Sequence, residues 1–348
     1  MPDTNTPPAA RTWRLYFECT DDPMRDSRDS GFVLIAVLAA LGLLAMVALL
    51  LTKTVSLDTK IAAFAAQQAR DEALADGLTR LAVQHLAVNQ PAAGKSGLFR
   101  LDGIPLFCRL NDHVASIAFF DTDGLINLNL ASQALFERVF TGIGMPPDDA
   151  TRLAQAVIDF RSTGDASLAG GSKQAAYQLA GLPHGPKAEA FATVGELDQV
   201  LGMTPALLAR LRPLMTVHSR FGVVDPRVAG LPVLLALAGD SRPTSTTPDP
   251  QTLDALRSTL DLPAAYTYIA RTRSTSSIKS EKYVVRAIVY RGRIARFVRQ
   301  ATVGAATNSQ SGASLKEWTA LDPGLYDFEG LDLAATPACL GGVLWIDP

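Results

Sequence analysis

The stretch from Gly31 to Leu51 (GFVLIAVLAALGLLAMVALLL) constrains the fold more than any other part of this chain. It contains no charged side chain, and a helix of this length, at about 1.5 Å per residue, spans the roughly 30 Å hydrocarbon core of a bilayer. A helix that is apolar on every side has no polar face to present to water. The sequence therefore predicts a membrane-spanning helix near the N-terminus.

A polar leader, residues 1–31, precedes this stretch and ends in RDSRDSG. A charged leader, a glycine, an aromatic residue and a helix that continues beyond the membrane resemble the type IV prepilin-like signal. The resemblance implies that prepilin peptidase cuts between Gly31 and Phe32 and methylates the new amino group of Phe32.

Two other interpretations compete for this stretch. A secretory signal peptide has a shorter apolar region, of about 7–15 residues, and a small-residue cleavage site that is missing here. A plain single-pass anchor fits the hydropathy equally well. Basic residues lie on both sides of the stretch, so the positive-inside rule does not decide the matter.

Charge and cysteine content bound the partners and the compartment. The leader carries four arginines against six acidic residues, a charge of −2; the whole chain is also −2, so the part after Gly31 is neutral. A neutral protein lacks the basic footprint of a nucleic-acid binder. Cys19 lies in the leader, which leaves Cys108 and Cys339. In an oxidising extracytoplasmic space these two can form a disulfide or remain separate buried thiols.

Beyond the membrane stretch, apolar residues recur at spacings of three and four, which predicts one continuous helix from Phe32 to about Val88. His85 lies on the apolar face and is expected to be a core residue, and Pro91 prevents the helix from continuing. The second half of the helix is amphipathic, so another part of the protein should pack on its stripe. That stripe consists of Leu57, Ile61, Phe64, Leu74, Leu78, Leu81 and Leu86.

The remaining chain alternates between strand and helix patterns. Short strands are expected within 98–110, where Gly103 and Pro105 mark a turn, and at 114–120, 265–273, 283–290 and 293–303. Helices are expected at 133–140, 148–161, 173–179, 194–201, 205–212 and 232–237. The stretch 240–250 is a predicted linker, 304–320 a polar loop, and the tail shows no clear period.

This order predicts an α+β fold in which a long N-terminal helix packs on a small antiparallel sheet interrupted by a helical block. The expected domains are the leader (1–31), the helix (32–92), the first part of the sheet domain (93–120), the inserted helical domain (121–240), the second part of the sheet domain (241–303) and a C-terminal extension (304–348).

Several segments, in this order, resemble the type II secretion system protein K family of minor pseudopilins: GFVLIAVLAAL, FFDTDGLINLN, AVIDFRSTGD, FATVGELDQVLGMTPALLARLRPLMTV and VVDPRVAGLPVLLALAG. The resemblance implies a pilin-like fold with an inserted all-α domain of helix-hairpin-helix or SAM-like type. It implies a single-pass inner-membrane protein with a short cytoplasmic N-terminus and a periplasmic globular part. It does not extend past about residue 304.

The same resemblance implies a structural role without catalysis. Members of the family cap the tip of the periplasmic pseudopilus and help to start its assembly, for the export of folded periplasmic proteins. Their partners are the minor pseudopilins I and J, and calcium is bound somewhere in the globular part.

The fifth residue after the predicted cleavage point is Ala36. Most pilin-like subunits resemble one another in carrying Glu there, where it pairs with the N-terminal amine of a neighbouring subunit. An unpaired carboxylate at membrane depth costs about 2.5–3.5 kcal/mol on insertion scales. A subunit at the tip has no neighbour above it whose amine could pair with a glutamate, so alanine avoids the cost of an unpaired carboxylate. Ala36 is therefore predicted to be a determinant of tip position.

Two turns, residues 141–144 and 201–204, resemble the helix-hairpin-helix units of DNA-binding proteins. Such units bind phosphate through backbone N–H groups at the start of the second helix. Asp148 and Asp149 follow the first turn and would repel phosphate. Structural packing is the favoured role of both turns, and a membrane-anchored DNA-binding protein is the alternative function.

The sequence offers no complete metal or catalytic motif. The acidic and amide groups lack the spacing of a calcium-binding EF-hand loop, so the calcium ligands stay unassigned. The chain contains no Gly-x-Ser-x-Gly, and its histidines do not cluster with acids at metal-ligand spacing, so no enzymatic activity is expected. The two groups considered as calcium ligands are Asp121, Asp123, Asn127 and Asn129, and Asp322, Asp327, Glu329 and Asp332.

Overall fold

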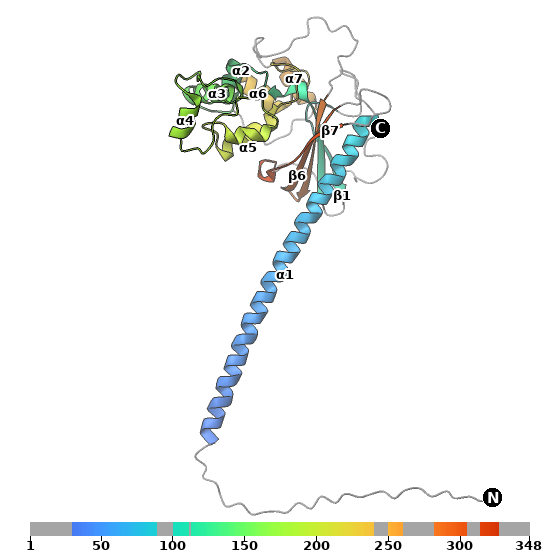
Figure 1. Cartoon of the computed structure of the whole chain (residues 1–348). Coiled ribbons are helices and arrows are strands. Elements are labelled where there is room, and N and C mark those ends of the chain that lie inside the picture. The colour runs from blue at the N-terminus through green and yellow to red at the C-terminus, as the bar shows by residue number, and fades with distance from the viewer. Residues whose placement is uncertain are drawn as a thin grey trace, which may run out of the picture. The chain divides into compact units, whose positions relative to one another are not determined.

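The computed structural model describes residues 30–88, 100–110, 113–239, 250–259, 282–304 and 314–326. The chain divides into two units, residues 1–64 and 65–348. Helix α1, from Ser30 to Val88, begins in the first unit and ends in the second (Figure 1). This confirms the single long helix predicted from the apolar spacing. In the first unit the side chains from Phe32 to Leu50 are exposed.

The second unit contains a five-stranded sheet in the order β1-β2-β5-β6-β7, with every neighbouring pair antiparallel. Strands β5 and β6 form a hairpin whose turn contains Gly292, with φ at +61°, a conformation that glycine adopts without steric cost. The strands are β1 (Leu106–Leu110), β2 (His113–Asp121), β5 (Lys282–Arg291), β6 (Ile294–Gly304) and β7 (Ser314–Leu321).

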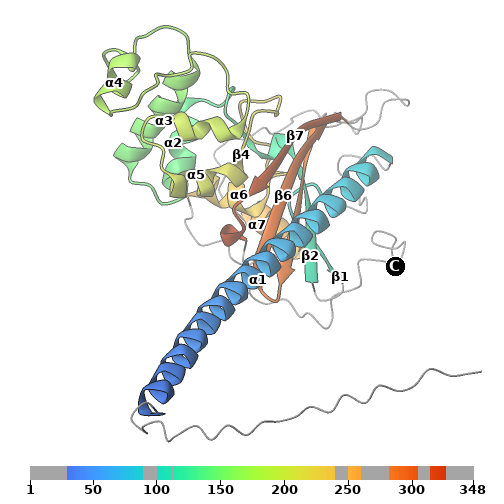
Figure 2. The ribbon, with the colours of Figure 1, turned by 60° about the horizontal axis from the view of Figure 1, so that its bottom comes forward.

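The two faces of this sheet are covered by different elements. Leu78 and Leu86 of α1 join a hydrophobic cluster with Ile117 and Phe119 of β2, so the second half of α1 lies across the sheet, as Figure 2 shows. Phe120, whose side chain points the opposite way, belongs to the core of the helical segment. Because successive side chains of a strand alternate between faces, β2 is buried along its whole length.

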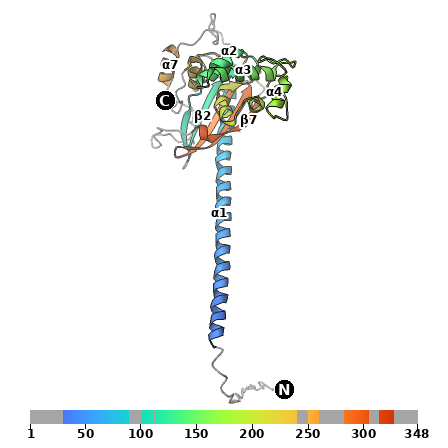
Figure 3. The ribbon, with the colours of Figure 1, turned by 90° about the vertical axis from the view of Figure 1, so that its left-hand side faces the viewer.

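The helical segment lies in the chain between β2 and β5, which confirms the predicted insertion of helices into a sheet. Its helices are α2 (Gln133–Gly142), α3 (Pro147–Arg161), α4 (Lys173–Leu179), α5 (Pro205–Leu211) and α6 (Leu231–Ala238). Three of its helices, α2, α4 and α5, begin at polar caps: the side chains of Ser132, Ser172 and Thr204 each accept a backbone N–H of the following turn. Figure 3 shows α2, α3 and α4 close to one another above the labels of β2 and β7.

Short elements complete the segment. Two-residue strands β3 (Ile126–Asn127) and β4 (Met215–Thr216) pair in parallel and hold the entry of the segment beside its later part. The 3₁₀ turns are η1 (Thr122–Gly124), η2 (Val194–Gln199), η3 (Arg212–Leu214) and, after β7, η4 (Pro323–Leu325).

Several predictions need correction. The polar loop expected at 304–320 is wrong for 314–321, where β7 pairs with β6 and adds an edge strand to the sheet. A helix, α7 (Pro250–Thr259), follows the predicted linker. Residues 194–199 form a 3₁₀ turn in place of the predicted α-helix. Of the β segments expected within 98–110, the described residues 100–110 contain strand β1, which follows the predicted turn at Gly103, in the left-handed region, and Pro105.

The predicted apolar stripe of α1 is only partly used by the sheet. Leu78 and Leu86 are buried, whereas Ile61, Phe64 and Leu81 are exposed. His85 is half-buried, and its burial lowers the pKa of the imidazole. Several predictions fall outside the described residues. They are residues 1–29 of the expected leader, the helix stop at 89–91, the linker residues 240–249, the strand at 265–273, Cys339, and the acidic residues Asp327, Glu329 and Asp332.

Candidate functional site

The first candidate surface is the apolar half of α1. Among the described helices, only Phe32–Leu50 is long and apolar enough to cross a membrane. The peptide bond between Gly31 and Phe32 lies within the first turn of the helix. Phe32 is exposed and Ala36 lies one turn further along, also exposed. By length and composition this half of α1 suits a membrane anchor.

Arg299 of β6 links the second half of α1 to the sheet. Its guanidinium donates to Asp76 Oδ1 at 2.5 Å and to Glu72 Oε1 at 2.6 Å, although Arg299 itself is only 7 % exposed. The guanidinium carbon also lies 5.4 Å from the centre of the Trp318 ring of β7. Charge-assisted hydrogen bonds of this kind are stronger than neutral ones, so Arg299 fixes α1 against the two strands.

A second polar contact of α1 involves Asp71, which is 2 % exposed. Its Oδ1 lies 3.0 Å from Nε2 of His113 at the start of β2. Arg291 and Arg296, at the β5–β6 hairpin, lie within 4.0 Å and 3.8 Å of the same carboxylate. A buried carboxylate requires compensating positive charge, and here the sheet supplies it.

The predicted Asp121–Asn129 cluster forms the joint between the sheet and the helical segment. Asp121 caps η1 by accepting the backbone N–H of Asp123 at 2.9 Å. Asp123 accepts the hydroxyl of Ser219 at 3.1 Å and pairs with Arg220 at 3.0 Å. Burial together with the charge of Asp121 raises the pKa of the neighbouring Tyr283 to about 12. The carboxylates therefore serve to close the joint.

The two asparagines of the cluster also bind protein groups. Asn127 accepts the amide of Asn129 at 2.7 Å and donates to the carbonyl of Ser219. Asn129 exchanges two hydrogen bonds with the backbone of Phe191, at 2.9 Å and 2.7 Å. Arg161, at the end of α3, donates to the carbonyls of Leu128 and Ala131, and its burial lowers the pKa of the guanidinium.

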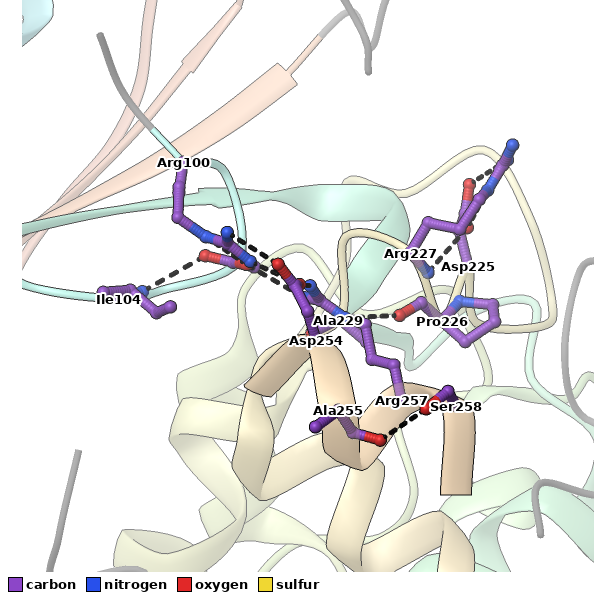
Figure 4. A network of polar contacts seen from close by, with 11 residues as sticks. Arg100, Ile104, Asp225, Pro226, Arg227, Ala229, Asp254, Ala255, Arg257 and Ser258 are labelled. Atoms are coloured by element: carbon purple, nitrogen blue, oxygen red, sulfur yellow. Dashed lines mark hydrogen bonds and ion pairs between the residues drawn. The ribbon is translucent and has the colours of Figure 1, made fainter. Parts of the chain in front are cut away.

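A network of four charges holds α7 near the joint, as Figure 4 shows. Asp102 is 5 % exposed and accepts from Arg100 at 2.6 Å and from Arg257 at 3.0 Å. Arg257 also donates to the carbonyl of Ala229. Hydrogen bonds from Arg100 hold the pKa of Asp254 below its usual value. The network connects α7 to the chain before β1 and to the loop before α6.

Both hairpin turns are used for packing. At Gly142, an added Cβ would lie 2.0 Å from the carbonyl oxygen of Ala236, so α2 and α6 approach closely there. Arg210, a basic residue that could face a phosphate, donates to the carbonyl of Ile143 in the other turn. The second turn follows η2, a 3₁₀ turn, so it does not join two α-helices.

Cys108 lies in β1, is 3 % exposed and is disulfide-bonded. The pairing with Cys339 stays a prediction, because Cys339 lies outside the described residues. Within the described part of the chain, no group of three or more His, Cys, Asp or Glu residues is placed to hold a metal ion.

These features define a class: an α+β protein with a long N-terminal helix, an apolar anchor, an antiparallel sheet and an inserted helical segment. Residues 110–220 match the family model for type II secretion system protein K. The resemblance found in the sequence is thereby confirmed for that segment, which contains the joint and most of the inserted helices.

Other comparisons add little. No curated protein matches the chain. The chain is similar to one in the crystal structure of the GspK–GspI–GspJ complex of the type 2 secretion system from enterotoxigenic Escherichia coli. The two share 16% identity over 74% of this chain and 98% of that one, with a TM-score of 0.45.

Sequence reasoning missed Asp71, Arg299 and the network of Asp102. Asp71 does have a signal in the sequence: it lies about one helical turn before Leu74 and two before Leu78 on a packing face, where a buried carboxylate calls for a cationic partner. Arg299 gave no such signal, because its partners Glu72 and Asp76 lie 227 and 223 positions away in the chain. Asp102 has Arg100 two positions before it, but its other partner, Arg257, lies 155 positions later.

Proposed function

We propose that this protein is a minor pseudopilin of the type II secretion system that caps the pseudopilus tip and helps to start its assembly for export of folded periplasmic proteins. The observation that carries the proposal is the helical segment inserted between β2 and β5, because its residues match the protein K family. The role is structural, and we assign no catalytic residue.

The apolar half of α1 supports the proposed insertion into the inner membrane and the proposed cleavage by prepilin peptidase. The α1 segment from Phe32 to Leu50 inserts into the inner membrane, and the globular part lies in the periplasm. Prepilin peptidase cuts between Gly31 and Phe32 and methylates Phe32. Ala36 supports the tip position, since a subunit without a neighbour above it gains nothing from a carboxylate at membrane depth.

The partners in this proposal are the minor pseudopilins I and J. Ile61 and Phe64 of α1 are 66% and 60% exposed, and both lie beyond the proposed membrane span. Residues three positions apart are neighbours on a helix surface, and adjoining exposed apolar side chains are a feature of interaction sites. We assign the contact with I and J to this part of α1.

Co-isolation of the full-length chain with minor pseudopilins I and J tests the assignment. We expect the double variant Ile61→Asp, Phe64→Asp to lose both partners, because two carboxylates would be desolvated at the interface. Leu179→Asp is the matched control, since Leu179 is 90% exposed on α4 and outside the proposed contact. Equal co-isolation of both variants would contradict the assignment. Salt-dependent retention on DNA would instead support the alternative DNA-binding function.

A further inference from the structure

The loop between α3 and α4, residues 162–172, closes around a buried lysine. Lys173 is 3 % exposed, and its ammonium donates to the carbonyl and to the hydroxyl of Ser162, both at 2.9 Å. Ser162 directly follows the last residue of α3, so its carbonyl lies at the negative end of the helix dipole. A positive charge is therefore built into the centre of this loop.

The carboxylates of the loop region are bound by the loop itself. Asp159 is 7 % exposed and accepts the hydroxyl of Ser167 at 2.6 Å and the amide of Leu168 at 3.1 Å. Asp165 accepts the amide of Gln174 at 3.0 Å. Hydrogen bonds from Ser172 and Gln174, helped by the charge of Lys173, lower the pKa of Asp165. Both carboxylates therefore already accept hydrogen bonds within this region.

These residues do not fit a calcium ion. Calcium takes six to eight oxygen ligands, several of them from carboxylates. Here the carbonyl and hydroxyl oxygens of Ser162 are already bound by the Lys173 ammonium, and that ammonium would repel a divalent cation. The carboxylates at the joint do not fit a calcium ion either, because Asp123 is paired with Arg220 and Asp225 with Arg227.

We propose that the Lys173 ammonium takes the place of a metal cation in this loop, so that residues 162–172 keep their closed structure without calcium. The family resemblance implies calcium somewhere in the globular part; in this chain the described helical segment supplies its own cations. The inference concerns the stability of the loop and does not depend on a position at the pseudopilus tip.

Hydrogen exchange of the full-length chain in detergent tests the proposal, with calcium alone as the probe. The amides to follow are those of Ser167, Leu168 and Gln174, which are hydrogen-bonded within the closed loop. We expect the same exchange rates in excess calcium and in excess chelator. Slower exchange of these amides in calcium than in chelator would overturn the proposal, and this comparison requires no variant.

A substitution identifies the charge responsible. Lys173→Met keeps most of the side-chain length but removes the donor to Ser162, so the loop amides should exchange about tenfold faster or more. Lys187→Met is the matched control, because Lys187 pairs with Glu196 elsewhere in the segment and should leave the loop unchanged. Unchanged loop exchange in Lys173→Met, with the amides of α6 as an internal reference for folding, would also overturn the proposal.

Discussion

At the scale of single residues, Gly142 sets how closely α2 and α6 approach. A methyl group there would meet the backbone of Ala236 at 2.0 Å, and backbone cannot move aside as a flexible side chain can. We predict that Gly142→Ala lowers the free energy of unfolding by about 1–3 kcal/mol, the usual cost of overpacking.

The control for this prediction is Gly77→Ala in α1, where an added Cβ meets nothing within 4 Å. Alanine in the middle of a helix is favoured over glycine by roughly 0.5–1 kcal/mol, so this variant should be neutral or slightly more stable. Denaturant unfolding of the full chain in detergent measures both. Equal stability of the two variants would show that the α2–α6 contact is not as close as described.

The residues of the joint illustrate what sequence could and could not predict. The sequence indicates that Asp121, Asp123 and Asn127 form a related group, because they follow one another within a few positions. It does not show their role, because Ser219, a partner of Asp123, lies 96 positions later in the chain. Local spacing shows which groups are close in sequence, and only the fold shows which donors reach them.

At the scale of elements, the contact of α1 with the sheet depends on Arg299. We predict that Arg299→Met destabilises the docked half of α1 by about 1–3 kcal/mol, because Glu72 and Asp76 lose charge-assisted donors. Hydrogen exchange of α1 residues 71–86 should accelerate accordingly. Arg152→Met is the control: Arg152 pairs with Asp149 at the surface, and such pairs contribute about 0–1 kcal/mol. Similar exchange in both variants would contradict the role of Arg299.

Long or strongly patterned elements could be predicted from the sequence, and short or exposed ones could not. Helix α1 and the β5–β6 hairpin have sustained periodicity. Strand β7 lacks a clear apolar period, because most of its residues are exposed or half-buried at the sheet edge and it carries Lys316 and Glu317. Helix α7 begins at the end of the Pro- and Thr-rich stretch 240–250, and its two leucines, Leu253 and Leu256, are a single turn apart, which is too short a run to show a helical period.

At the scale of the whole molecule, the disulfide of Cys108 connects the sheet to another part of the chain. Cleavage after Gly31 would remove Cys19, so the mature protein retains Cys339 as the one other cysteine. We predict that unreduced peptide mapping of the mature protein finds Cys108 linked to Cys339. Closing so long a loop should stabilise the fold by several kcal/mol, with about 4.7 expected for a 100-residue loop. Free thiols at both positions would contradict the prediction.

The central claim for the whole molecule is its proposed position at the tip of the pseudopilus. Ala36 supports this position, and so does the bulk of the helical segment, which would obstruct another subunit stacking on top. Immunogold labelling of assembled pseudopili with antibodies against residues 113–239 tests it most directly. Antibodies against the major subunit, which should label the whole shaft, serve as the control. We predict label at one end of each fibre. Label distributed along the shaft would contradict the assignment of this protein to the tip.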